Sequence, residues 1–311
     1  MDPDDASPGD PFVHPALFYR GEEEYLAGTV PFLRDGLDAG EPVAVAVPGP
    51  RLGVLRTALG AAADGVRWLD MTEAGRNPGR IIPGVLREFA DRHPAGRVRI
   101  IGEPVWPGRT GTEYPACAQH EALINLAFAG REVSILCPYD LAGLDAVVIS
   151  DARATHPVVI DRHGTRASGD YAPGRVIDSY NRPLPEPSDA ARMSFDLDGL
   201  PRVREFTCRW ARHLGLAPDP AGDLEVAVHE LAANSCLHGG GKGTARIWSE
   251  DGQVVCEVSD AGTIDDPLAG RRPAAMSPLG GRGILLVNHL ADLVRVHTGP
   301  GGTAIRVYMR V

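Results

Sequence analysis

In the first half of the chain, short apolar runs alternate with longer segments whose apolar residues recur every three or four positions. The runs have the length of buried strands and lie at 43–47, 66–69, 98–101, 132–136 and 158–160. The longer segments have helical spacing and lie at 22–39, 50–60, 80–92, 115–129 and 140–148. Because strands alternate with helices, residues 15–160 are predicted to form a parallel sheet with helices on both faces.

The second half has strands in runs with only a few helices between them. Its expected elements, in chain order, are a strand at 193–197, helices at 201–214 and 220–237, a hairpin of strands 244–249 and 254–259, a helix at 282–290, and strands at 293–297 and 303–311. A loop rich in Gly and Pro fills residues 260–281. This order predicts a second domain at 193–311, an antiparallel or mixed sheet covered by helices on one side.

Two segments lack these patterns. Residues 1–14 are rich in Pro and Asp, and we expect them to be disordered. Residues 161–192 are rich in Arg, Gly, Pro and Asp and include Pro-Leu-Pro-Glu-Pro at 183–187. We expect this second segment to be a linker between the domains.

Composition narrows the classes of function. A chain of 311 residues is long enough for two domains, and its net charge of −10 disfavours direct nucleic-acid binding and suits basic protein partners. No apolar run approaches the ~18 residues of a membrane span. The first residues, Met-Asp-Pro-Asp-Asp, lack the basic start and apolar run of a signal peptide. The five scattered cysteines form no C-x-x-C pair, so we expect buried thiols in a reducing cytoplasm and no disulfide framework or zinc site.

The helix that contains residues 228–240 carries an unusual set of polar side chains. Glu230, Asn234 and His238 recur at intervals of four and therefore share one helix face. A carboxylate, an amide and an imidazole together are typical of a site. Taken alone, however, the triplet is equally consistent with a solvated helix edge.

Three glycine-containing motifs follow the triplet. Asp260-Ala-Gly262 ends a strand, where a carboxylate can accept from an exocyclic amine and a glycine lets a flat ring approach. Gly280-Gly-Arg-Gly283 leads into a helix, whose free N–H groups favour phosphate. Gly301-Gly-Thr303 opens the last strand with a hydroxyl. Each motif is weak alone, but their order and spacing are much more specific.

With these motifs in this order, residues 193–311 resemble the GHKL ATPase superfamily, most closely its anti-sigma-factor serine kinases of the RsbW type. The resemblance implies a Bergerat α/β sandwich that binds ATP and Mg²⁺. It assigns Asn234 to the metal, Glu230 to general-base catalysis or to orienting the attacking hydroxyl, and Asp260 to the adenine amino group. Segment 262–283 would be a lid over the nucleotide. The remaining residues assigned to nucleotide binding are His238, Gly262, Gly281, Arg282, Gly283 and Thr303.

The sequence departs from that family at one position. Ile264 stands where the second glycine of D-x-G-x-G is usual, and the loop after it is rich in proline. This departure makes lid closure and kinase turnover less certain than nucleotide binding. No helical hairpin with a phosphorylatable histidine precedes the domain, which disfavours a sensor histidine kinase, and we expect His229 to face away from the site.

The first half resembles the MEDS sensory domain, a relative of the RecA/KaiC-like fold. The matching residues are Phe18-Tyr19, 32–37 followed by Gly40-Glu-Pro42, and Cys137-Pro-Tyr-Asp140. No G-x-x-x-x-G-K-[ST] motif is present, so this half is not expected to hydrolyse a nucleotide. Candidates for a ligand pocket are Trp106, His120, Glu121 and Tyr139. Cys137 is interpreted as a buried thiol, not as a redox sensor.

The leading hypothesis is a cytoplasmic signalling protein with a sensory input domain and an ATP-binding anti-sigma module. That module would sequester a sigma factor and phosphorylate a serine of an anti-anti-sigma (STAS) partner. The alternative is a nucleotide-gated binding module that transfers no phosphate, and a third hypothesis is a pseudo-ATPase without nucleotide. The resemblance also implies a homodimer.

Overall fold

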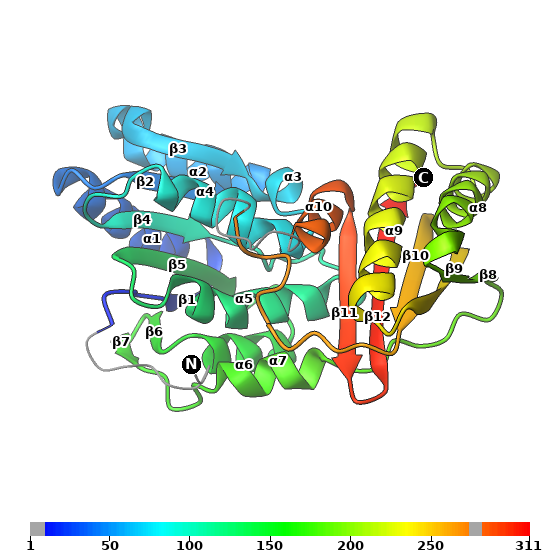
Figure 1. Ribbon diagram of the computed structural model, residues 1–311. Coiled ribbons are helices and arrows are strands. Elements are labelled where there is room, and N and C mark those ends of the chain that lie inside the picture. The colour runs from blue at the N-terminus through cyan, green and yellow to red at the C-terminus, as the bar shows by residue number, and fades with distance from the viewer. Residues whose placement is uncertain (1–9, 274–281) are drawn as a thin grey trace. The chain divides into compact units, whose positions relative to one another are not determined.

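The computed structural model describes residues 10–273 and 282–311. The chain divides into two compact units, Met1–Tyr180 and Asn181–Val311, and each is described by itself. The elements of both units are labelled in Figure 1.

The first unit is built on a seven-stranded sheet in the order β3-β2-β4-β5-β1-β6-β7. The strands are β1 (Pro15–Tyr19), β2 (Val43–Val47), β3 (Val66–Asp70), β4 (Val98–Gly102), β5 (Val133–Asp140), β6 (Val158–Asp161) and β7 (Gly164–Ala167). All neighbours pair in parallel except β6 and β7, which form an antiparallel hairpin. The predicted parallel sheet is therefore confirmed.

The helices of this unit connect successive strands. They are α1 (Gly21–Asp38), α2 (Gly49–Leu59), α3 (Met71–Ala74), α4 (Arg87–Asp91), α5 (Tyr114–Phe128), α6 (Ala146–Thr155) and α7 (Pro173–Tyr180). Short 3₁₀ helices, η1 (Gly60–Gly65) and η2 (Pro78–Arg80), and the π-helical segment η3 (Ile82–Leu86) extend the connections. The helix predicted at 140–148 begins at Ala146 instead, because residues 141–144 form a turn after β5.

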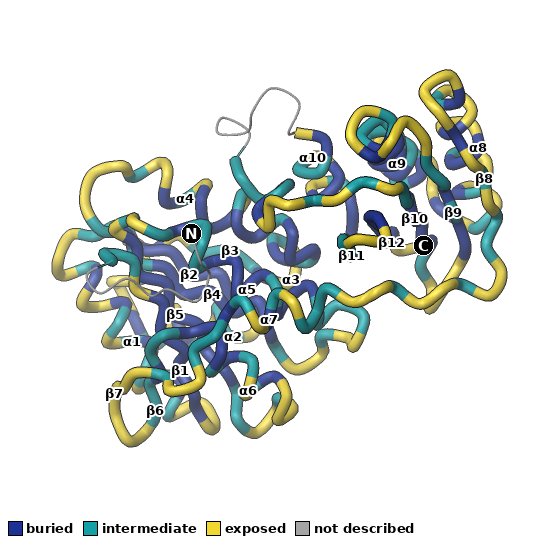
Figure 2. The backbone as a smooth tube through the Cα atoms, turned by 60° about the horizontal axis from the view of Figure 1, so that its bottom comes forward, coloured by how far each residue is buried: buried dark blue, intermediate teal, exposed yellow. Residues whose placement is uncertain are grey.

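The core of the first unit lies on both faces of the sheet. Leu17 and Tyr19 of β1 belong to a cluster with Tyr25 and Leu33 of α1. The alternate residues of the same strand, Ala16 and Phe18, are also buried. Most residues of the central strands β4, β5 and β1 are buried, and these strands are mainly dark in Figure 2. The strand β1 was not predicted from the sequence, although it is as fully buried as the predicted strand β2.

Two segments that we expected to lie outside the domains fold with the first unit. Residues 1–9 of the expected disordered N-terminus lie outside the described residues. By contrast, Val13 forms a parallel bridge with Ser134, and Phe12 stacks on Phe128. Residues 161–180 of the expected linker form β7 and α7. In α7, Val176 is buried against α5. The apolar face of α7 is therefore the physical reason that this part of the expected linker folds with the first unit.

The second unit has a five-stranded antiparallel sheet in the order β11-β12-β10-β9-β8. The strands are β8 (Ala191–Asp196), β9 (Lys242–Glu250), β10 (Gln253–Asp260), β11 (Leu293–Gly299) and β12 (Gly302–Arg310). Three helices pack on it: α8 (Leu200–His213), preceded by the turn η4 (Leu197–Gly199), α9 (Pro218–His238) and α10 (Gly283–Leu290). The mixed α/β class predicted for the chain is confirmed.

The two faces of this second sheet have different chemistry. Apolar residues of β9, β10 and β12, such as Ile247, Cys256 and Val307, join the helices in one core. On the other face, the Glu257 carboxylate accepts hydrogen bonds from Arg246 (2.8 Å) and Arg306 (2.6 Å). Arg306 also donates to the carbonyl of Pro185, so the segment before β8 covers this ion network.

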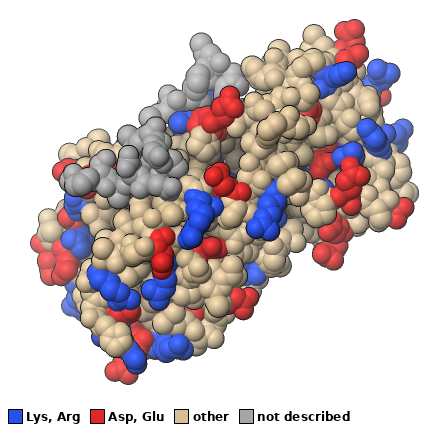
Figure 3. Space-filling model, turned by 90° about the horizontal axis from the view of Figure 1, so that it is seen from below, with Lys and Arg blue, Asp and Glu red and all other residues tan. Residues whose placement is uncertain are grey.

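Among the described residues, no helix combines the length and the apolar character needed to cross a membrane. Acidic and basic side chains are interspersed over the face of the molecule seen in Figure 3, with no broad basic area on it.

Candidate functional site

The polar triplet lies on the last turns of α9. Leu231 and Ser235 are buried, whereas Glu230 and Asn234 are half-buried and His238 is exposed. Asn234 and His238 line one cavity. Glu230 does not line that cavity, but its Oε2 would lie 3.0 Å from a Cβ added at Gly283. The same Cβ would lie 3.2 Å from Asn234 Nδ2, so both side chains meet the start of α10.

Asp260 ends β10 with both carboxylate oxygens engaged. Its Oδ1 accepts from the Gly262 amide at 2.8 Å, and its Oδ2 accepts from the Ser235 hydroxyl at 2.6 Å. A carboxylate oxygen has more than one lone pair, so each oxygen can accept a further donor. A Cβ at Gly239, the residue after α9, would lie 2.3 Å from Asp260 Cγ. Only glycine therefore leaves room for this carboxylate.

A chain of hydroxyl groups holds the segment after Asp260. Thr303 donates to the Gly262 carbonyl at 2.8 Å and lies 2.9 Å from the Thr298 hydroxyl. The Ile264 amide donates to Thr298 Oγ1 at 2.8 Å. Thr298 and Thr303 face each other because β11 and β12 pair them directly. The backbone that leads into the expected lid is thus fixed to the last two strands.

The cavity between α9, α10 and the sheet has a volume of 410 Å³. This volume is within the usual range for small-molecule sites. Its floor includes apolar residues such as Val258 and Ile305. The predicted site residues that line it are Asn234, His238, Asp260, Gly262, Gly283 and Thr303. The fold therefore brings together residues from four separate motifs.

The other predicted residues lie elsewhere or outside the description. Arg282 is exposed immediately before α10. Gly281 and the lid residues 274–281 lie outside the described residues. The described part of the expected lid is anchored: Leu268 is buried, and the Asn288 amide donates to the Gly270 carbonyl at 3.1 Å. The Ile264 side chain packs against the core of the unit.

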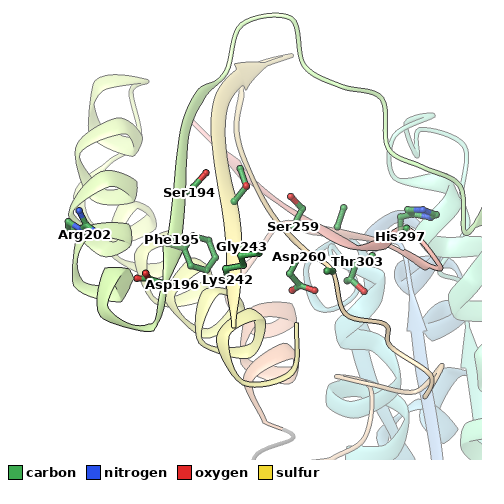
Figure 4. Close-up of a pocket in the computed structure, with 15 residues that line it drawn as sticks. Ser194, Phe195, Asp196, Arg202, Lys242, Gly243, Ser259, Asp260, His297 and Thr303 are labelled. Atoms are coloured by element: carbon green, nitrogen blue, oxygen red, sulfur yellow. The ribbon is translucent and has the colours of Figure 1, made fainter. Parts of the chain in front are cut away.

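A second depression of 780 Å³ shares Asp260 and Thr303 with the first (Figure 4). It runs along the ends of the strands, where Asp196 ends β8 and Lys242 begins β9. Lys242 is the only lysine of the chain. This depression lacks Asn234 and Gly283, so the smaller cavity joins more of the predicted site.

His229 lies apart from both cavities. It lines a groove between α8 and α9 together with Arg204, Cys208 and Arg212. Adjacent residues on a helix point about 100° apart, which separates His229 from Glu230. The His229 side chain therefore faces away from the candidate site, as predicted.

The pocket candidates of the first unit lie in its interior. His120, Glu121 and Tyr139 are buried, and Tyr139 donates to Glu121 Oε2 at 2.9 Å. Trp106 is half-buried, and its ring stacks against the guanidinium of Arg109 at 3.8 Å. Three of the four candidates therefore lie in a closed polar cluster.

The carboxyl ends of the parallel strands carry a second polar group. Glu103 follows β4 and is buried, and burial raises its pKa to about 8, although the nearby Arg51 opposes this shift. Arg51 donates to the Tyr19 hydroxyl at 2.8 Å and lies 3.8 Å from Asp140. Asp140, which ends β5, is one of the residues that resemble the MEDS motif.

Two family matches cover most of the chain. The family described as "MEDS: MEthanogen/methylotroph, DcmR Sensory domain" matches residues 13–157. The family described as "Histidine kinase-like ATPase domain" matches residues 193–309. The chain carries a MEDS domain and a histidine kinase-like ATPase domain. Both resemblances seen in the sequence are confirmed at this level.

The similarity of the chain to a solved structure is low. The chain is similar to the crystal structure of the RsbU and RsbW domains of a protein from Mycobacterium tuberculosis, with 19% identity and a TM-score of 0.30. The match covers 40% of this chain and spans only 33% of that one. No curated protein matches the chain.

An ATPase domain of this class implies nucleotide binding, and the cavity suits that ligand. Asp260 offers a carboxylate to an exocyclic amine, and the half-buried Asn234 offers the oxygen ligand that Mg²⁺ prefers. The start of α10, beside Asn234, offers helix N–H groups to phosphate. Our sequence analysis missed Ser235, Gly239 and Thr298, which orient Asp260 and its loop. Ser235 and Gly239 directly follow Asn234 and His238 in the sequence, but only the fold shows their contacts with Asp260.

Proposed function

We propose that the chain is a cytoplasmic signalling protein whose ATPase domain binds Mg-ATP and controls a sigma factor. In this proposal the domain sequesters the sigma factor and phosphorylates a serine of an anti-anti-sigma (STAS) partner. The MEDS domain receives the signal, a small molecule or a partner protein. The chain acts as a homodimer, as its resemblance to anti-sigma-factor kinases implies.

One observation supports the nucleotide site most strongly. Asp260, held by Ser235 and Gly262, faces the same 410 Å³ cavity as Asn234 and Gly283. The carboxylate distinguishes adenine, which has an exocyclic amine to donate, from a purine that presents a carbonyl there. When bound, Mg-ATP supplies the phosphoryl group for transfer. Asn234 would hold the metal, and the start of α10 would receive the phosphates.

Glu230 is the proposed base. Its carboxylate lies next to Gly283, where the phosphate end of the nucleotide is expected, and outside the adenine end of the cavity. In that place a carboxylate can accept the proton of an incoming serine hydroxyl. Transfer itself depends mainly on positioning and charge stabilisation.

A second function is favoured by Ile264. Its side chain packs on the core and its amide is bonded to Thr298, so the start of the lid is anchored where the family usually has a glycine. A lid with less freedom favours a module in which ATP sets the conformation and no phosphate is transferred. The two functions share the site and differ only in turnover.

Calorimetric titration with Mg-ATP tests the site. Asn234→Ala and Asp260→Asn should each weaken binding at least tenfold, whereas Asp223→Asn should bind like the wild type. Asp223 is a matched control because it is an exposed acid on the same helix. Wild-type protein that is folded and binds neither Mg-ATP nor Mg-ADP would establish the pseudo-ATPase and refute the proposed site.

Phosphoryl transfer is tested with ATP labelled in its γ-phosphate and a panel of STAS domains. The kinase function predicts labelled serine with wild-type protein and with Asp223→Asn, and none with Glu230→Ala. ATP binding without any labelled serine would support the non-catalytic module. Equal labelling by Glu230→Ala and the wild type would remove Glu230 from the mechanism.

A further inference from the structure

Four buried side chains with metal-ligating atoms converge in the interior of the MEDS domain. They are His14, Glu121, Cys137 and His156, and one ligand atom of each lies within 4.8 Å of all the others. None is more than 2% exposed. The residues come from the start of β1, from α5, from β5 and from the end of α6, so the fold itself assembles this group.

Hydrogen bonds determine which nitrogen of His156 carries a proton. Nδ1 lies 2.8 Å from the carbonyl of Ala152, which can only accept, so Nδ1 is the donor. Nε2 then has a free lone pair unless the ring is charged. It lies 3.0 Å from Glu121 Oε2, so the two atoms are close enough to share a cation. Two acceptors at this distance repel each other unless a proton or a metal ion lies between them.

His14 is oriented in the same way. Its Nδ1 lies 3.1 Å from Asn125 Oδ1. The Asn125 amide nitrogen donates to the carbonyl of Thr155 at 2.8 Å, which leaves Oδ1 to accept from His14. Its Nε2 therefore presents a lone pair to Cys137 Sγ at 3.5 Å.

The spacing of the four atoms matches a metal centre. Tetrahedral zinc with bonds of 2.0–2.3 Å separates its ligand atoms by roughly 3.3–3.8 Å. Three of the six pairs here are 3.0 Å (His156 to Glu121), 3.5 Å (His14 to Cys137) and 3.8 Å (His14 to Glu121), and the other three lie within 4.8 Å. Histidine ligands in metal sites usually donate their second N–H to a carbonyl or carboxylate, and both histidines here donate to a carbonyl oxygen.

We propose that the MEDS domain holds one divalent transition-metal ion, with zinc the best fit, bound by His14 Nε2, a Glu121 carboxylate oxygen, Cys137 Sγ and His156 Nε2. Two nitrogens, one sulfur and one oxygen favour zinc over magnesium or calcium, which prefer oxygen alone. When the metal binds, the S–H bond of Cys137 breaks, the proton is released to solvent, and a metal–sulfur bond forms. Four protein ligands in a closed interior describe a structural site that ties β1, β5, α5 and α6 together.

This proposal revises one expectation from the sequence. The cysteines showed no zinc spacing, because the ligands of this site are separated by up to 142 positions. Only the parallel pairing of β1 with β5, which places Ala16 beside Cys137, brings His14 to the cysteine. Tyr139, which donates to Glu121, then orients the carboxylate ligand.

Cobalt(II) is the probe that tests the site. The full chain is freed of metal with a chelator, its fold is checked by circular dichroism, and it is titrated with cobalt(II) in the absence of nucleotide. Wild-type protein should bind one cobalt per chain and show the near-ultraviolet charge-transfer band of a thiolate ligand. Zinc should displace the cobalt, and either metal should raise the unfolding temperature.

Variants assign the ligands. Cys137→Ser should lose the charge-transfer band, and His156→Gln should bind cobalt at least tenfold more weakly. Cys117→Ser is the matched control, because this cysteine of the same unit is also buried but lies outside the cluster, and it should keep the band. Folded wild-type protein that takes up no cobalt, or a thiolate band that survives Cys137→Ser, would overturn the proposal even if other variants fail to fold.

Discussion

The space beside Asp260 allows a sharp test with one methyl group. In Gly239→Ala the new Cβ would lie 2.3 Å from Asp260 Cγ, whereas an ordinary contact needs at least 3.4 Å. The carboxylate must therefore move by about 1.1 Å (3.4 − 2.3). Gly239 has φ −97°, so the backbone itself accepts alanine, and any effect reports on the carboxylate alone.

The displacement acts on affinity through hydrogen bonds. It pulls Asp260 away from Ser235 and Gly262 and out of line with the amine of a bound adenine. A hydrogen bond to a charged group contributes roughly 1.5–3 kcal/mol, and losing one such bond to the nucleotide weakens binding roughly 10- to 150-fold. The unfolding free energy should also fall, because the two bonds within the protein are strained.

Calorimetric titration of Mg-ATP and urea unfolding measure the two effects. Gly222→Ala is the control, because it adds the same methyl group to α9 where nothing lies within 4 Å. It should leave the affinity unchanged and stabilise the helix by up to about 1 kcal/mol. If folded Gly239→Ala binds Mg-ATP within twofold of the wild type, Asp260 does not contact the base and the reasoning is refuted.

Three further predictions concern other parts of the chain. Burial raises the pKa of Glu103 to about 8, so its neutral form is favoured in the folded state. The stability that it contributes is complete below its unfolded pKa near 4.5 and is lost as the pH rises towards 8, with a slope of at most about 1.4 kcal/mol per pH unit. Glu103→Gln should remove this slope from urea unfolding measured across that range. Glu257→Gln leaves the buried Arg306 without its carboxylate and should lower the unfolding free energy by about 3–5 kcal/mol. Ile264→Gly removes a side chain packed on the core and adds backbone freedom, so hydrogen exchange of residues 262–273 should become faster.

Two of these predictions have a matched control variant, and the Glu103 prediction has a contradicting outcome. An unchanged slope in Glu103→Gln would assign the pH dependence to other groups. Glu225→Gln breaks an ion pair with Arg204, whose side chain is 52% exposed, and should change stability by less than about 1 kcal/mol. A similar loss in both glutamate variants would contradict the role of burial. Ile264→Val keeps the packing, so residues 262–273 should exchange their amide hydrogens at the wild-type rate. If Ile264→Gly also exchanges at the wild-type rate, contacts other than those of Ile264 hold the lid.

Local patterns predicted most of the fold. Helical spacing placed α9 within two residues at its start, because its apolar residues recur regularly along 21 positions. The strand β1 lies between β5 and β6, and its short apolar run cannot be distinguished from a buried helix segment by periodicity alone. The helix α7 was missed because glycine and proline surround a short apolar face.

The candidate site was predictable only where its residues share one element. Asn234 and His238 are one helical turn apart, so spacing alone placed them together. Thr298 meets Thr303 through the register of β11 and β12, which no local pattern specifies. The metal-ligating cluster is the extreme case, since its contacts depend on strand order and on the packing of two helices.

Lys242 gives this chain an unusual chemical property. It is the only lysine in 311 residues and lies in the depression next to Asp260, at the start of β9. Apart from the terminal amine, every amine-directed reagent must therefore react at the rim of the proposed nucleotide site. A single fluorophore attached to Lys242 would report nucleotide occupancy without mutagenesis. Acetylation of a lysine side chain in this sequence can occur only at Lys242.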